Sequence, residues 1–140
     1  MSVKRTSHAV YNINYHFVWA PKYRQSILFG KLESRIKELF LEIAQQYDFD
    51  IEVQEMNLDH VHLFVSAPPR FSPAQLVERL KSISSRIIFK EFPDLKKKLW
   101  AGQLWSDGYY VGTSGDKITN ETIKKYIKQQ KQQKLNLFFG

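Results

Sequence analysis

Two histidines separated by one residue are the side chains in this chain best suited to chemistry. His60 and His62 lie in the stretch 58–66, where apolar and polar residues alternate as they do in a β-strand. Successive side chains of a strand point to opposite faces, so both imidazoles share one face, and Val61 and Leu63 take the other. Two imidazoles on a stiff element form half of a divalent-metal site. The strand alone also fits a simpler interpretation, in which the histidines are the polar face of an amphipathic strand.

Tyr126 and Gln130 are a second pair of candidates, near the carboxyl end of the chain. The segment 121–131 has the pattern of a helix, and residues four apart on a helix lie one above the other. Ile123 and Ile127 form an adjacent apolar stripe that can dock this helix. The segment therefore predicts either a helix that presents a phenol and an amide together, or a tyrosine packed in the core beside a solvated glutamine.

The elements that must position these candidates follow one another in a simple order. We expect strands at 11–20, 51–56, 58–66 and 109–113, helices at 31–47, 73–92 and 121–134, and a loose basic arm at 1–9. Ser72, Pro73 and Gln75 supply a capping box and a first-turn proline for the second helix. The short joint between the second and third strands favours an antiparallel hairpin.

This order, β-α-β-β-α-β, predicts an α+β fold of ferredoxin-like (split βαβ) topology. Such a fold has an antiparallel sheet with helices on one face, to which this chain adds a C-terminal helix. We expect residues 1–140 to form a single domain. The first and third strands are neighbours in this topology, so the face opposite the helices carries His60 and His62. Asn14 and His16 are candidates for positions beside them.

The amino-acid composition excludes several classes of protein. The chain has no cysteine, which excludes disulfides and zinc ribbons and suits a cytoplasmic location. No apolar run reaches membrane-spanning length, and we expect no signal peptide and no membrane partner. The net charge of +7 suggests a polyanionic partner, most simply nucleic acid, although a solvated basic surface would give the same charge.

Several short motifs, taken in order and spacing, resemble one family. They are Tyr15-His16-Phe17-Val18-Trp19, Lys22-Tyr23-Arg24, Asp59-His60-Val61-His62-Leu63, Leu80-Lys81-Ser82-Ile83-Ser84-Ser85-Arg86, Leu99-Trp100-Ala101-Gly102-Gln103-Leu104-Trp105-Ser106 and Lys125-Tyr126-Ile127. Together they resemble the TnpA transposases of the insertion-sequence-200-like (200-605) type, which are single-tyrosine HUH (histidine–hydrophobic–histidine) enzymes. The resemblance spans nearly the whole chain. Leu58 departs from it, because the family has proline before the Asp-His pair, and this affects a turn and no chemical group.

The resemblance implies a transposase that cleaves and rejoins single-stranded DNA at insertion-sequence ends. Tyr126 would be the nucleophile and form a 5′-phosphotyrosine intermediate, and His60, His62 and Gln130 would bind Mg²⁺ or Mn²⁺. It also implies a homodimer in which the tyrosine helix of each subunit completes the metal site of the other, a preference for DNA hairpins, and a prokaryotic, nucleoid-associated protein. Three alternatives stay open: a replication initiator or relaxase, a domesticated relative that processes palindromes, and a non-catalytic RNA- or DNA-binding module.

The proposed chemistry suits these residues. A phenol has a pKa near 10, so at neutral pH about one in a thousand is ionised, a deficit of about 4 kcal/mol that a divalent ion on the scissile phosphate can offset. The three ligands are all neutral, which leaves the ion its full charge for phosphate. No glycine-rich phosphate loop for ATP is present in the sequence. No general base is identified, because Lys125 adjoins Tyr126 without facing it and Asp59 alternates away from the histidine face.

The candidates for contacting DNA are cations and a few aromatic residues. They are Lys4, Arg5, Lys22, Tyr23, Arg24, Arg79, Arg86, Lys96, Lys97 and Lys98, with Phe71 as a further ring on which an extruded base could stack. An exposed strand at 109–113 is compatible with pairing across a two-fold axis.

Overall fold

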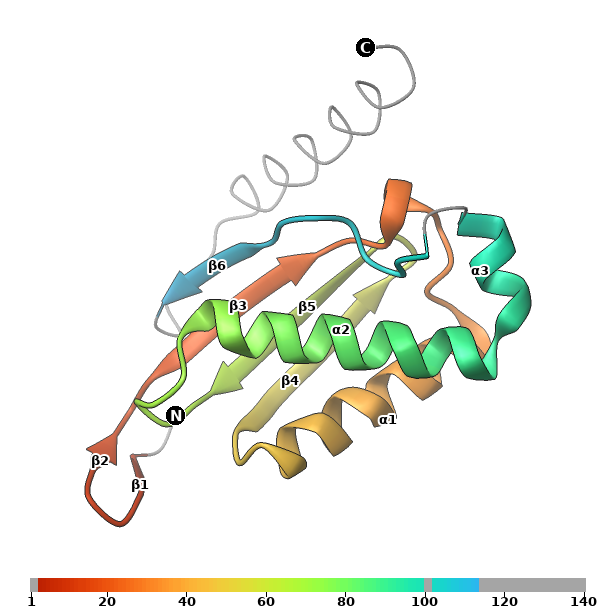
Figure 1. Cartoon of the computed structure of the whole chain (residues 1–140). Coiled ribbons are helices and arrows are strands. Elements are labelled where there is room, and N and C mark those ends of the chain that lie inside the picture. The colour runs from red at the N-terminus through yellow and green to blue at the C-terminus, as the bar shows by residue number, and fades with distance from the viewer. Residues whose placement is uncertain (1–2, 100–101, 114–140) are drawn as a thin grey trace.

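A computed structural model of the chain describes residues 3–99 and 102–113. Four strands form an antiparallel sheet in the order β4-β5-β3-β6. Helices α1 and α2 lie side by side on one face of this sheet (Figure 1). The elements of this body are β3 (Asn14–Trp19), α1 (Gly30–Gln46), β4 (Asp50–Asn57), β5 (His60–Ser66), α2 (Pro73–Glu91) and β6 (Tyr110–Thr113).

The predicted ferredoxin-like topology and α+β class are confirmed. The central strands are β5 and β3, and β4 joins β5 through a two-residue turn at Leu58 and Asp59. Short elements complete the described chain: β1 (Lys4–Arg5), β2 (Val10–Tyr11), the 3₁₀ turn η1 (Lys22–Arg24) and α3 (Pro93–Leu99). The predicted helix at 121–134, with Tyr126 and Gln130, lies outside the described residues. None of the helices in the described residues has the length and apolar character needed to cross a membrane.

The amino-terminal segment differs from the prediction. Residues 1–9 were expected to be a loose arm, but β1 pairs with β2 in a small antiparallel hairpin. Thr6 closes its turn, because its backbone N–H donates to the Ala9 carbonyl at 2.8 Å and its hydroxyl oxygen accepts the Ala9 N–H at 3.0 Å. The predicted strand at 11–20 is also divided, and its main part begins at Asn14.

The core lies between the sheet and the two helices. Phe17 and Trp19 of β3 are 0% exposed, as are Val61, Leu63 and Val65 of β5. These strand residues pack against the buried side of the helices. The helical members of the core are Ile36, Leu39, Phe40 and Ile43 of α1 and Leu76, Val77, Leu80 and Ile88 of α2. Phe17 and Trp19 of β3 therefore face the helices and are not displayed as a base-stacking platform.

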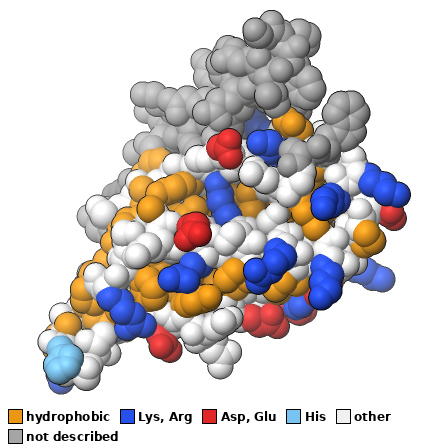
Figure 2. Space-filling model, viewed as in Figure 1, with side chains coloured by type: hydrophobic (Ala, Val, Ile, Leu, Met, Phe, Trp, Pro, Cys, Tyr) orange, Lys and Arg blue, Asp and Glu red, His pale blue; other side chains and the backbone are white. Residues whose placement is uncertain are grey.

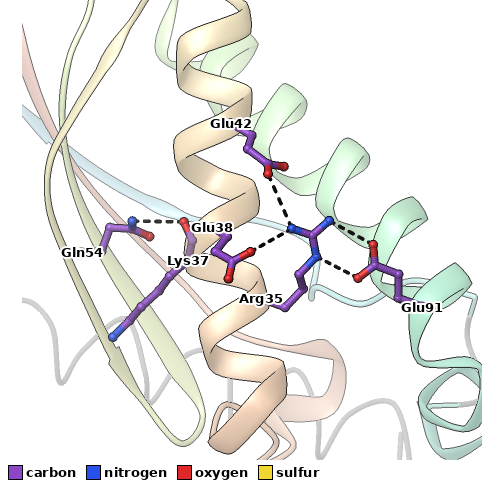
Figure 3. Close-up of polar contacts among 6 residues, drawn as sticks. All are labelled: Arg35, Lys37, Glu38, Glu42, Gln54 and Glu91. Carbon is purple, nitrogen blue, oxygen red and sulfur yellow. Dashed lines mark hydrogen bonds and ion pairs between the residues drawn. The ribbon is translucent and has the colours of Figure 1, made fainter.

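Charged residues join the outer sides of the two helices (Figure 3). Arg35 of α1 makes two bonds to Glu91 of α2, at 2.8 and 3.0 Å, and also pairs with Glu38 and Glu42. The hydrogen bond to Glu91 is the main reason that the pKa of Arg35 is raised. Because these side chains are partly exposed, the cluster links the two helices with only a modest gain in stability.

The segment 102–109 is tied to α2 by side-chain bonds. The indole N–H of Trp105 donates to the Ser84 hydroxyl at 2.9 Å, and the Leu104 N–H donates to the Ser85 hydroxyl at 3.1 Å. Lys81 donates to the carbonyls of Ser106 and Gly108 at 2.8 and 2.6 Å. The hydroxyl-rich stretch of α2 therefore holds the chain that leads into β6.

The start of α2 gives a stability prediction. Ser72 accepts the Gln75 N–H at 3.1 Å, while the Gln75 side chain accepts the Ser72 N–H at 2.8 Å. Replacing Ser72 with alanine removes half of this box, and we expect Ser72→Ala to lower the free energy of unfolding by about 1 kcal/mol. Ser82→Ala, an exposed site on the same helix, is the matched control and should change it by less than about 0.5 kcal/mol. Urea denaturation of both variants measures the difference, and equal losses would contradict this prediction.

Candidate functional site

The pairing of β5 with its neighbours collects polar side chains on the face of the sheet that the helices leave free. His60 pairs with Asn57 of β4, and His62 lies between Glu55 of β4 and Val18 of β3. Residues directly opposite one another in adjacent strands share a face, so these side chains lie together. In Figure 2, which views the helix side, histidine is seen only over the β1–β2 hairpin and not over the sheet.

Both ring nitrogens of His60 have partners. Nδ1 lies 2.9 Å from Oδ1 of Asp59, and Nε2 lies 2.7 Å from Nδ2 of Asn57. A carboxylate only accepts hydrogen bonds, so the proton of a neutral His60 lies on Nδ1. The amide of Asn57 then donates to the lone pair of Nε2. Nε2 is therefore the atom of His60 that can bind a metal.

His62 is buried beside a third histidine. Its Nδ1 lies 3.2 Å from Nε2 of His16, and the two side chains are 8% and 4% exposed. Burial, followed by the charge of His62, lowers the pKa of His16 to about 4. Burial, followed by the charge of His60, also lowers the pKa of His62. These histidines are therefore neutral at physiological pH, which is the state in which imidazole binds metals.

An ion pair supports the first histidine. Arg24 of η1 donates from Nε to Oδ2 of Asp59 at 2.7 Å. Burial raises the pKa of Asp59, but the hydrogen bond from His60 and the charge of Arg24 outweigh it and hold that pKa below its usual value. The expectation that Asp59 faces away from the histidines is wrong, because Asp59 lies in the turn before β5, where strand alternation does not apply.

The two histidines fit one half of a divalent-metal site. Their ring centroids lie 5.0 Å apart and their planes are inclined by 65°, while both Nδ1 atoms have protein partners. Among the described residues no group of three or more His, Cys, Asp or Glu side chains is arranged to hold a metal. A complete site therefore requires a donor from elsewhere, and the predicted third ligand, Gln130, lies outside the described residues.

Aromatic side chains border the histidines on the β3 and β6 side. The ring of His16 stacks on Phe64 with centroids 4.1 Å apart, and Tyr110 of β6 lies edge-on at 6.2 Å. Gly112 makes room for Tyr110, because a Cβ at this position would lie 2.7 Å from the phenol oxygen. Tyr110 is thus a tyrosine that the described residues place on the histidine face.

A cavity lies on the helix side, between α2 and the segment 102–109. It has a volume of about 670 Å³, and Arg86 and Lys96 are among the residues that line it. Lys81 also lines it, with its ammonium 5.9 Å from the ring centroids of Trp19 and Tyr109. Burial lowers the pKa of Lys81 to about 8. Figure 2 shows Lys and Arg side chains spread over this helix-bearing face, with fewer acidic ones.

The other predicted DNA contacts are scattered. Lys4 is paired with Asp50 and Glu52, and the guanidinium of Arg79 lies over the Tyr47 ring at 4.3 Å. Lys96, Lys97 and Lys98 form the last turn of α3, Lys22 lies 5.7 Å from the Tyr23 ring, and Arg5 is exposed in β1. Phe71 packs against the core. Arg24 supports Asp59, so its contact with DNA stays a prediction, as do the contacts of the other candidates.

Three side chains have roles at the site that were not predicted from the sequence, and Arg24 was predicted only as a DNA contact. Asn57 could have been found from the hairpin itself, because a two-residue turn places Asn57 opposite His60. Arg24 and Tyr110 depend on contacts between segments far apart in the chain, and no local pattern indicates them. His16, which was a candidate, is confirmed as a neighbour of His62.

Comparison with known proteins identifies the family. The sequence model described as Transposase IS200 like matches residues 9–130. The chain is 36% identical over 130 residues to the ISDra2 transposase TnpA of Deinococcus radiodurans, covering 93% of this chain and 92% of that one. It is 32% identical over 127 residues to the transposase for insertion sequence element IS200 of Salmonella typhimurium, covering 91% and 82%.

Solved structures agree with this match. A crystal structure of a candidate transposase from Deinococcus radiodurans R1 superposes with a TM-score of 0.82 at 34% identity, covering 91% of this chain and 97% of that one. A REP-associated tyrosine transposase bound to a REP hairpin has a TM-score of 0.53 at 12% identity, covering 92% and 68%, and so shares the fold. The chain that presents His60 and His62 on the free face of its sheet belongs to the IS200-like transposase family.

Proposed function

We propose that this protein is a metal-dependent transposase that cleaves and rejoins single-stranded DNA at the ends of an insertion sequence. The observation that carries the proposal is the pair His60 and His62, whose Nδ1 atoms are both bonded to protein on the open face of the sheet. A neutral imidazole anchored through Nδ1 offers its Nε2 lone pair to a divalent ion. A binding module would have no need for this arrangement.

The proposed ion is Mg²⁺ or Mn²⁺, held by His60, His62 and Gln130. When bound, it would neutralise the scissile phosphate and stabilise the leaving oxygen. The two imidazoles favour Mn²⁺ more than Mg²⁺, since Mn²⁺ accepts mixed nitrogen and oxygen ligands. The lowered pKa of His62 suits such an ion, because no proton has to be displaced from this imidazole at physiological pH.

The proposed nucleophile is the phenol of Tyr126. Its oxygen attacks the phosphorus, and the bond from phosphorus to the 3′-oxygen breaks. The phenol loses one proton and the leaving 3′-oxygen gains one, which makes it a 3′-hydroxyl. The phosphodiester energy is kept in the 5′-phosphotyrosine bond, so another 3′-hydroxyl can reverse the step on a second strand without ATP.

The proposed substrate is a DNA hairpin at each element end. The relative of known structure that shares the fold is described as bound to a REP hairpin. In this chain, Arg86 and Lys96 border the cavity between α2 and the segment 102–109, and Lys97 and Lys98 adjoin it in sequence. This basic surface lies on the helix side of the sheet, away from the histidines, so a hairpin could be held there while the strand to be cut reaches the other face.

We also propose that the protein acts as a homodimer. Among the described residues, β6 lies at one edge of the sheet, with one side paired to β3. A strand at the edge of a sheet can pair with a strand of a second copy. The tyrosine segment of one subunit would then complete the histidine site of the other.

The nucleophile can be tested with two matched tyrosine variants. The protein is mixed with Mn²⁺ and a labelled single-stranded oligonucleotide copied from the palindromes beside the gene, and denaturing electrophoresis then detects a covalent adduct. We expect Tyr126→Phe to abolish the adduct, because only the phenol oxygen can form it, and Tyr110→Phe to retain it. The reverse result would assign the nucleophile to Tyr110.

The proposed role of the histidines in cleavage can be tested separately from DNA binding. We expect His60→Ala and His62→Ala to lose at least 100-fold in adduct formation while binding the hairpin within about 3-fold of the native affinity, because the metal acts on the scissile phosphate only. Fluorescence anisotropy in chelator measures the binding. Equal loss of cleavage and binding would make these histidines structural.

The basic cavity gives a third test. We expect Arg86→Ala combined with Lys96→Ala to weaken hairpin binding at least 10-fold. The slope of log affinity against log salt concentration should fall by the amount expected for the loss of one to two phosphate contacts. Lys31→Ala combined with Lys37→Ala removes the same charge from α1 and is the control. Equal losses for the two double variants would show that net charge, and not this cavity, determines binding.

A further inference from the structure

We propose that Asp59 and His16 are positioning residues that fix the tautomers of the two metal-binding histidines. Each contacts Nδ1 of one histidine: Asp59 at 2.9 Å from His60, and His16 at 3.2 Å from His62. The inference rests on the proposed function, because it explains how His60 and His62 would both offer Nε2 to one ion.

The direction of the bond at His60 is fixed by chemistry. The carboxylate of Asp59 accepts the Nδ1 proton through Oδ1, while its other oxygen, Oδ2, accepts from Arg24 at 2.7 Å. A carboxylate with both oxygens engaged cannot rotate without losing one bond. Arg24 therefore holds Asp59 in place, and Asp59 holds the ring of His60 with its Nε2 lone pair on the side away from Asp59.

Asn57 shows which atom is left for a ligand. Its Nδ2 lies 2.7 Å from Nε2 of His60 across the hairpin, so a hydrogen-bond donor already occupies the direction in which a cation would lie. Asn57 belongs to β4, and its side chain would have to turn away from His60 for an ion to bind. Its amide contacts only Nε2, so it does not compete with Asp59 for Nδ1.

His16 plays the same part for His62 from the next strand. His62 can bind a metal through Nε2 only if Nδ1 carries the proton, so that Nε2 of His16 is the acceptor. His16 must then carry its own proton on Nδ1, which is buried and has no hydrogen-bond partner among the described residues. Stacking on Phe64 keeps the ring in the plane required for this contact. A buried nitrogen without a partner lowers stability, and this tautomer carries that cost.

The direct test is the tautomer of His60 in the native, metal-free protein. Nitrogen-15 NMR under mildly basic conditions distinguishes a proton on Nδ1 from one on Nε2. We expect Nδ1–H for both His60 and His62. A proton on Nε2 of either ring would overturn the assignment for that ring, whatever the enzyme does.

Metal affinity tests the consequence. We expect Asp59→Asn to weaken Mn²⁺ binding by about 10- to 100-fold, measured by EPR of free Mn²⁺ without DNA, because the amide can donate to Nδ1 and reverse the tautomer. Asp50→Asn removes a carboxylate that pairs with Lys4 at the far end of β4 and should leave Mn²⁺ affinity unchanged. Circular dichroism and hairpin binding confirm that both variants are folded.

His16→Phe should weaken Mn²⁺ binding by a similar factor, whereas His16→Gln, whose side-chain oxygen can accept the His62 proton, should restore part of it. The outcomes separate this inference from the proposed function. If His60→Ala abolishes Mn²⁺ binding and Asp59→Asn does not weaken it, the positioning role is wrong and the transposase site stands. If the native protein neither binds Mn²⁺ nor forms a DNA adduct, the proposed function itself fails.

Discussion

The pairing register of β5 between β3 and β4 is the constraint on which the site depends. Each residue of β5 faces either the helices or the open side, and a slip of one residue would exchange the two sets. Val61, Leu63 and Val65 are fully buried beneath the helices, so such a slip would turn these core residues away from the helices and turn the histidines toward them. The hydrophobic core therefore fixes the orientation of His60 and His62.

The same burial sets the electrostatics of the open face. His16 and His62 are almost inaccessible to water, and this is the main reason that their pKa values are lowered. Close by, Asp59 stays ionised because His60 and Arg24 stabilise its charge. The site thus keeps His16 and His62 neutral and Asp59 charged. The first state follows from burial, and the second from the hydrogen bond and the ion pair that Asp59 makes.

Local patterns in the sequence predicted the sheet and helices, because strand alternation and helical periodicity report burial directly. The start of α2 was also predictable, since Ser72 and Gln75 satisfy its first N–H groups from within four residues. The β1–β2 hairpin was missed because two-residue strands have too few side chains to show a period. The bond from Arg24 to Asp59 joins residues 35 apart in sequence, and only the folded chain brings them together. Tyr126 and Gln130 stay predictions.

The bonds from Lys81 to the carbonyls of Ser106 and Gly108 have a consequence for how the chain continues. They secure the approach to β6, whose last residue, Thr113, is paired with Tyr15 of β3. Tyr126 follows Thr113 by 126 − 113 = 13 residues, and a fully extended chain of that length spans about 45 Å at most. The backbone of Tyr126 therefore lies within about 45 Å of the anchored end of β6.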